Sequence, residues 1–157
     1  MARRKKTWIE KRDGAPAPHV DQISKPFAGM PAGAKVLISS PLEIEAYIRA
    51  IPKGRTRTIP DMRADLAKAH KARATCPLTA SIFTRIVAEA ALEEMAAGKK
   101  RIAPFWRVID AKSPIAGKLS CGPDYIAHAR ALEGIENSSR AAPAPSAKAS
   151  RAKLQRA

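Results

Sequence analysis

The sequence predicts a mostly α-helical domain with a small β element. Aromatic residues make up only 4% of the 157 residues, whereas 45% are apolar, and this balance favours a compact core of Ala, Leu and Ile side chains. Apolar residues recur at the three- and four-residue spacing of amphipathic helices between positions 41 and 134. Short extended stretches before and after these helices predict the β element.

Composition divides the chain into three parts. Residues 1–34 are basic and contain several Pro and Gly residues that interrupt regular elements, so we expect an irregular arm. Residues 35–137 carry the helical pattern and form the predicted folded domain. Residues 138–157 are basic and of low complexity, and we expect a disordered tail.

The folded part begins with a short strand and a clearly marked helix. Residues 34–39 (AKVLIS) have the composition of a strand. Ser40 is the predicted N-cap of the helix, Pro41 occupies its first position, and Glu43 completes a capping box. The helix then presents one apolar stripe, formed by Ile44, Tyr47, Ile48 and Ile51.

Two more helices follow in the middle of the chain. One begins near Thr58 and runs to about His70, and the segment 71–77 (KARATCP) is a predicted turn. The next helix, over 77–97, is the longest and ends at Gly98. Its expected apolar stripe consists of Ile82, Phe83, Ile86, Val87, Ala90, Ala91 and Met95.

Beyond the long helix we expect a two-stranded ribbon and a final helix. The segments 101–109 (RIAPFWRVI) and 117–120 (GKLS) are predicted to be extended, and the last helix runs from about Pro123 to Gly134. Two helices, a turn, a long helix and a ribbon are the outline of a winged helix-turn-helix. In such a domain the second helix of the pair lies in the major groove of DNA.

The net charge of +15 is the strongest compositional signal of function. Residues 1–12 carry six Lys or Arg and one Glu, and residues 138–157 carry five Lys or Arg and no acid. Basic ends on a basic body favour a polyanion such as nucleic acid as the partner. The alternatives are that the ends only keep the protein soluble, or that they contact anionic membrane.

Other classes of protein are disfavoured by the sequence. It contains no apolar run long enough to span a membrane and no hydrophobic segment behind the basic N-terminus, so we expect a cytoplasmic protein. Cys76 and Cys121 have neither disulfide nor zinc-site spacing. We expect no metal, no cofactor and no membrane partner.

Residues 41–134 resemble the DNA-binding domain of the methylated-DNA–protein-cysteine methyltransferases (alkylguanine-DNA alkyltransferases) and their non-catalytic alkyltransferase-like relatives. The order and spacing of five stretches support the resemblance. They are AIPKGRTRT (50–58), FTRIVAEAAL (83–92), APFWRVI (103–109), GKLS (117–120) and ARALEGI (129–135). The resemblance implies the winged helix-turn-helix of the alkyltransferase C-terminal domain and a role related to DNA repair.

The catalytic pair of that family is missing here. Phe105 and Trp106 stand at the positions of the Cys and His in the family's Pro-Cys-His-Arg signature. A phenyl ring and an indole supply neither a nucleophile nor a proton relay, so we expect no alkyl transfer and place the chain near the alkyltransferase-like branch. An active alkyltransferase that uses Cys76 or Cys121 instead is the enzymatic alternative.

The resemblance also suggests residues that contact DNA. Arg85 falls where the family has an arginine that enters the base stack. Ser81 and Thr84 lie beside it on the expected polar face of the long helix, and could donate hydrogen bonds to phosphates. Additional candidate phosphate contacts are Arg55, Arg57, Lys99 and Lys100.

The segment from Pro104 to Arg107 has two interpretations. In the functional one, Phe105 and Trp106 form the floor of a pocket where a base stacks. In the structural one, which we favour, the rings fill the volume of the former active site and Arg107 binds neighbouring carbonyls or a carboxylate.

The sequence thus predicts a monomeric, non-enzymatic protein that binds double-stranded DNA, on the nucleoid if the cell is bacterial. A sensor of O6-alkylguanine that recruits a repair protein is one form of this function, and a binder indifferent to lesions is another. A module that binds RNA or acidic proteins through its basic ends is the alternative from a different class.

Overall fold

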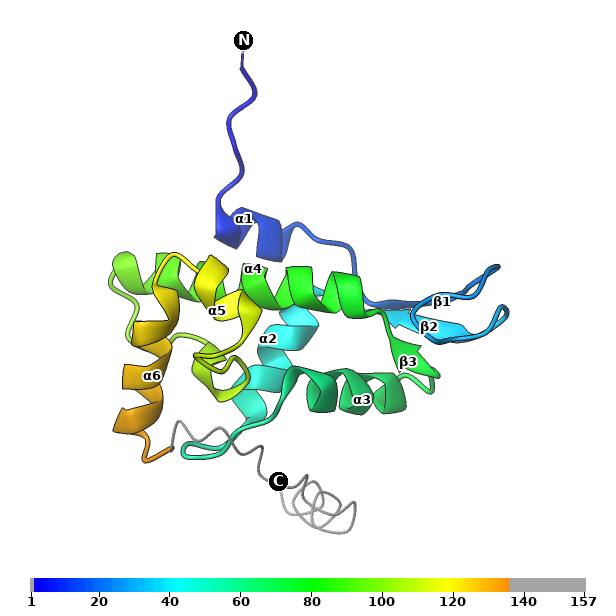
Figure 1. Ribbon diagram of the computed structural model, residues 1–157. Coiled ribbons are helices and arrows are strands. Elements are labelled where there is room, and N and C mark those ends of the chain that lie inside the picture. The colour runs from blue at the N-terminus through cyan, green and yellow to red at the C-terminus, as the bar shows by residue number, and fades with distance from the viewer. Residues whose placement is uncertain (1, 136–157) are drawn as a thin grey trace.

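The computed structural model describes residues 2–135 and is mostly helical with a small sheet, as the sequence predicts (Figure 1). The tail expected over residues 138–157 lies outside the described residues. The elements are α1 (Trp8–Asp13), β1 (His19–Gln22), β2 (Lys35–Ile38), α2 (Pro41–Ala50), α3 (Ile59–Ala69), β3 (Ala74–Thr75), α4 (Pro77–Ala96), the 3₁₀ helix η1 (Phe105–Arg107), α5 (Pro114–Lys118) and α6 (Gly122–Leu132).

The predicted starts of α2 and α3 are confirmed by their capping bonds. Ser40 accepts a hydrogen bond from the Glu43 amide at the start of α2. Thr58 and Asp61 form a reciprocal capping box at the start of α3. In both helices a proline lies in the first turn, where its missing N–H costs nothing.

The sheet lies at one end of the molecule, where the start of α4 and the end of α3 meet (Figure 1). Strand β2 is central. It pairs antiparallel with β1, with Val20 opposite Leu37, and parallel with β3, with Val36 opposite Ala74. Residues 35–38 are therefore a strand as predicted, whereas their partner β1 belongs to the arm.

The arm is more regular than expected, since it contains α1 and β1. A capping box between Thr7 and Glu10 starts α1. The N-terminal amides of Trp8 and Ile9 donate to the carboxylate of Glu93 on α4, at 2.9 and 3.1 Å. In Figure 1 α1 lies directly against α4, and the chain before it extends away from the body. The arm therefore packs on the long helix.

The prediction of a two-stranded ribbon after α4, formed by residues 101–109 and 117–120, is wrong. Residues 105–107 form a 3₁₀ turn closed by hydrogen bonds from the Val108 and Ile109 amides to the Phe105 carbonyl. Pro114 begins a short helix that includes Lys118, so the segment 117–120 is not a strand. The physical reason is that Pro favours the first turn of a helix, and that the buried Phe105 ring needs a bent backbone to point inward.

The core lies between α2, α3, α4 and α6. Its largest fully buried side chains in this region are Phe105, Leu37, Ile44, Ile48, Met62, Ile109 and Ile126. Helix α4 passes through the middle and is covered on several sides. For this reason its buried residues include Ala80, Thr84 and Ala88, while Ile82 and Met95 of the predicted stripe are exposed.

Candidate nucleic-acid interface

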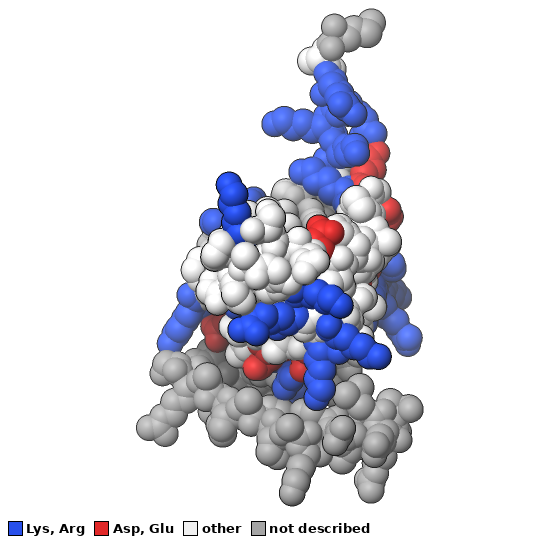
Figure 2. Space-filling view, turned by 90° about the vertical axis from the view of Figure 1, so that its right-hand side faces the viewer, with Lys and Arg blue, Asp and Glu red and all other residues white. Residues whose placement is uncertain are grey.

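Exposed cations gather where the sheet, the C-terminus of α3 and the N-terminus of α4 meet. Lys35 and Arg73 lie on neighbouring chain segments, and the Arg73 amide donates to the Lys35 carbonyl at 2.9 Å. Figure 2 views this end and shows Lys and Arg side chains above and below an uncharged area, with a few Asp and Glu side chains among them. We call it the basic end face and define it by five exposed cations of these segments: Lys25 in the loop after β1, Lys35 in β2, Lys68 at the end of α3, and Lys71 and Arg73 before β3. None of these five side chains forms an ion pair with a described carboxylate.

Lys71 holds an unusual backbone conformation on this face. Its φ of 55° is left-handed. The Ala72 amide donates to the Ala67 carbonyl and the Lys71 amide to the Lys68 carbonyl, which is the Schellman arrangement at a helix C-terminus. Glycine usually occupies this position, and a side chain there costs about 1 kcal/mol. A lysine therefore occupies the site at a conformational cost.

The N-terminal part of α4 is open to solvent beside these cations. Leu78 is 63% exposed and Ile82 is 49% exposed, and Ser81 lies between them on the exposed side. The later part of the helix is covered by α1. Of the predicted DNA contacts on α4, Ser81 alone lies in the uncovered part.

Thr84 cannot contact DNA. Its side chain has no exposed surface, and its hydroxyl donates to the Ala80 carbonyl at 2.6 Å. The prediction placed Thr84 on the polar side because it treated α4 as a helix with one buried stripe. Packing on more than one side brings Thr84 into the interior.

Arg85 is only half-exposed, and its guanidinium is already engaged. Nη2 donates to the Lys118 carbonyl at 3.2 Å, and the guanidinium carbon lies 5.4 Å from the centre of the Trp8 ring. Nε is enclosed. Insertion of Arg85 into a base stack would therefore require α1 to leave α4.

The remaining predicted phosphate contacts do not converge on one surface. Arg57 donates to the Tyr47 hydroxyl at 3.2 Å and to the Asp65 carboxylate at 2.6 Å, and Lys99 pairs with Glu94 at 3.0 Å. Arg55 is exposed in a loop whose Gly54 approaches Glu133 at the end of α6. Lys100 is exposed beyond the C-terminus of α4. The helix is about 30 Å long, so Lys100 lies far from the uncovered N-terminal part of α4.

The segment 104–107 is packed in the core, and its Phe105 ring is closed to solvent. Pro104 is buried, and Phe105 has no exposed surface. The Phe105 ring contacts Trp106 edge-on at 5.4 Å and stacks on Tyr125 at 6.0 Å between centres. A base cannot stack on the Phe105 ring, because solvent does not reach it. The Trp106 ring is half-buried and packs edge-on against Phe105 and Tyr125, and this geometry agrees with the structural interpretation.

Arg107 joins three distant parts of the chain. Its Nη1 donates to the Ile51 carbonyl at 2.6 Å, and its Nη2 donates to the Glu133 carboxylate at 2.6 Å. Burial by itself would raise the pKa of Glu133, but hydrogen bonds from Arg107 and from the Gly54 amide outweigh it and leave that pKa lowered. Arg107 is therefore a structural cation.

The two thiols offer little to an alkyl-transfer reaction. Cys76 is buried in the small cluster under the sheet. Burial raises the pKa of the half-buried Cys121 thiol, which lowers its thiolate fraction at neutral pH. Within residues 2–135 no cluster of His, Cys, Asp and Glu has the composition to hold a metal ion, and no helix is long and apolar enough to cross a bilayer.

Sequence reasoning missed the basic end face. Lys35 lies in the predicted strand, and Lys71 and Arg73 lie in the predicted turn, so the cations were visible in the sequence but were divided between two elements. Pairing of β2 with β3 brings it together. Comparison with known proteins adds no candidate, because no family model matches the chain and no curated protein or solved structure is significantly similar to it.

Proposed function

We propose that the chain binds double-stranded DNA through the basic end face and carries out no reaction on it. The observation that carries the proposal is a set of five exposed cations on one face without carboxylate partners. Such cations are free to replace the counterions that condense on the phosphate backbone. The net charge of +15 adds long-range attraction for the same partner.

The proposal assigns a helix-turn-helix role to α3 and α4. The turn between them, residues 70–76, carries Lys71 and Arg73, and the first turns of α4 expose Leu78, Ser81 and Ile82. Residues at the start of a recognition helix are the ones that reach base edges, while the flanking cations contact phosphates. In this version of the winged fold the hairpin of β1 and β2 takes the role of the wing.

The geometry supports contact with intact duplex better than recognition of an extruded base. The volume that would hold an O6-alkylguanine is filled by Phe105, and Arg85 is held by Trp8 and the Lys118 carbonyl. The buried Cys76 and the raised pKa of Cys121 give no support to an alkyltransferase. Direct damage sensing is therefore the weaker form of the proposal.

Equilibrium binding to a short duplex over a series of salt concentrations tests the proposal. Five phosphate contacts predict a slope of about −4.5 in a plot of the logarithm of the association constant against the logarithm of the salt concentration. A structured RNA of equal charge is the comparison ligand. Tighter binding to RNA at every salt concentration, or a slope near zero with DNA, would contradict the proposal.

A further inference from the structure

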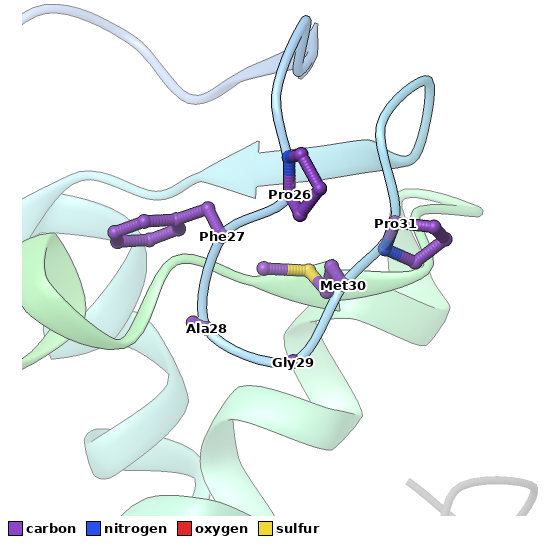
Figure 3. A pocket seen from close by; sticks show the side chains of 6 residues that line it. All are labelled: Pro26, Phe27, Ala28, Gly29, Met30 and Pro31. Carbon is purple, nitrogen blue, oxygen red and sulfur yellow. The ribbon is translucent and has the colours of Figure 1, made fainter.

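The loop between β1 and β2 carries an uncharged, exposed tip between two lysines. Residues 26–34 contain no charged side chain, and Lys25 and Lys35 flank them directly. Within this loop the amides and carbonyls of Phe27 and Met30 exchange two hydrogen bonds, at 3.0 and 2.9 Å. Figure 3 shows the tight turn that results.

The turn is narrow because of its two central residues. Ala28 has a φ of 51° and Gly29 a φ of 79°, so both adopt the left-handed conformation of the tightest hairpin turns. Ala adopts this conformation rarely. Neither Ala28 nor Gly29 carries a bulky side chain. The tip of the turn is therefore about as wide as two adjacent backbone segments.

One side chain anchors the turn and another is presented by it. Met30 is buried and packs with Ala34, Val36 and Cys76 beneath the sheet. Phe27 is 45% exposed although it is the largest side chain of the loop. In Figure 3 its ring extends from one side of the turn while Pro31 lies on the other. The six residues from Pro26 to Pro31 border a hollow of about 460 Å³.

The loop belongs to the basic end face, because Lys25 and Lys35 lie at its two ends. Lys35 pairs across the hairpin with Gln22, and its carbonyl accepts from the Arg73 amide. Figure 2 shows an uncharged area on this end, with Lys and Arg above and below it. An exposed aromatic ring in a loop flanked by Lys25 and Lys35 matches the minor groove, where apolar side chains insert between base steps that lie between two rows of phosphates.

We propose that the turn at 27–30 enters the minor groove of duplex DNA and that Phe27 acts as a wedge against a base step. This inference rests on the proposed DNA binding and specifies how the hairpin contributes to it. Lys25 and Lys35 contact the phosphates on either side of the groove. A membrane surface fits less well, because Phe27 is the one large exposed apolar side chain that this loop offers for insertion.

The test compares the full chain with its Phe27→Ala variant on a short duplex. The duplex carries the fluorescent base 2-aminopurine at its centre and a dye pair at its ends, which report unstacking and bending. The wild-type chain is expected to raise the 2-aminopurine fluorescence and to bend the duplex, since inserted wedges unstack and kink DNA. Phe27→Ala is expected to abolish both signals and to weaken binding about tenfold, with an unchanged salt slope.

Leu132→Ala is the matched control, because Leu132 is an exposed apolar residue at the end of α6. It should change neither optical signal, and thermal unfolding should show that both variants are folded. If the wild-type chain binds with the expected salt slope but Phe27→Ala behaves like Leu132→Ala, the wedge is wrong and the proposed function stands. Absence of duplex binding by the wild-type chain would overturn both.

Vesicles of anionic lipid form a separate arm of the experiment. Loss of vesicle binding by Phe27→Ala, with unchanged DNA signals, would assign the loop to a membrane surface and overturn the inference. Equal vesicle binding by both chains, together with the loss of the DNA signals, supports the minor-groove assignment.

Discussion

Arg73 and Arg107 carry the same charge in opposite surroundings. Arg107 is enclosed, and its guanidinium binds the Ile51 carbonyl and the Glu133 carboxylate. Arg73 is exposed on the basic end face, and no described carboxylate pairs with it. A strongly positive chain therefore contains two populations of cations, one that holds the fold together and one that is available to a partner.

Arg107 is not the only enclosed cation among the described residues. Arg12 is buried and pairs with Glu45 and Glu94, which fixes α1 to α2 and α4. Arg130 is buried, and its Nε donates to the Trp106 carbonyl at 2.7 Å. Formal charge alone consequently overstates the surface available to DNA. The predictions below test whether the two populations behave as differently as their surroundings indicate.

The largest effect is expected from Arg107→Ala. The substitution leaves the Glu133 carboxylate, which is 8% exposed, without its main partner, and should lower the free energy of unfolding by about 3 kcal/mol. Denaturant unfolding measures this loss. Duplex affinity, measured where the variant is still folded, should remain within about twofold.

Arg73→Ala is the control, and it should lower the affinity for duplex with little change in stability. It should change the free energy of unfolding by less than about 0.5 kcal/mol, because the side chain is exposed. It should also weaken duplex binding. Comparable stability losses for the two variants would show that the distinction between structural and available cations is wrong.

Acid should weaken the ion pairs of the enclosed arginines, because it protonates their carboxylate partners Glu94 and Glu133. Burial raises the pKa of Glu94, but a hydrogen bond from Arg12 and the ion pair with Lys99 outweigh it and leave that pKa lowered, and the pKa of Glu133 is lowered as well. Both carboxylates thus bind protons less readily in the folded state. Their stabilisation is complete above the ordinary pKa of 4.5 and is lost as the pH falls through the lower, folded values.

Denaturant midpoints between pH 7 and pH 3 measure this acid dependence. The Glu133→Gln variant should be less stable at pH 7 and should lose less on acidification than the wild-type chain. An identical pH profile for the two proteins would contradict the assignment of Glu133.

Lys71→Gly should raise the free energy of unfolding and at the same time weaken the salt dependence of duplex binding. Glycine relieves the left-handed conformation at φ 55°, so the free energy of unfolding should rise by about 1 kcal/mol. Removal of one phosphate contact should reduce the magnitude of the salt slope by about 0.9. Lys71→Gln is the matched control: it should change the slope equally without the gain in stability.

The smallest effect is expected from Arg85→Ala. Since its guanidinium binds the Lys118 carbonyl and lies over Trp8, we expect less than a twofold change in affinity for plain duplex and for duplex with O6-methylguanine. Competition binding with the two duplexes makes the comparison. A loss confined to the lesion would restore the base-extruding role of Arg85 and the damage-sensor form of the function.

Local signals in the sequence were sufficient for most of the helices. N-cap residues and apolar periodicity located α2 and α3 closely, because these signals act over a few neighbouring residues. The predicted capping box of α2 is incomplete, since the Glu43 carboxylate binds Ser39 and His70 instead of the Ser40 amide. Helix α4 has no side-chain cap and was located by its periodicity and by Gly98. The same kind of signal was available for α1, since Thr7 and Glu10 form a capping box, but Pro and Gly in the following arm obscured it.

Features that depend on distant contacts could not be predicted. The arm strand β1 forms because β2 offers it an edge, and residues 105–107 bend because the core takes in Phe105. The residues of the candidate interface were the least predictable, because their exposure depends on contacts between distant segments. Thr84 is buried by neighbouring elements, and Lys35 and Arg73 become a common surface only after the strands pair.

The most direct measurement compares the salt dependence of duplex binding for two variants that each lose five cations. The first replaces the basic end face with Gln at positions 25, 35, 68, 71 and 73. The second replaces exposed cations elsewhere with Gln, namely Lys53, Arg55, Lys100, Arg101 and Lys112. We predict that the first variant loses about 4.5 in the magnitude of the slope and the second at most about 1. Equal losses would contradict the account, because they would mean that DNA responds to the overall charge and not to this face.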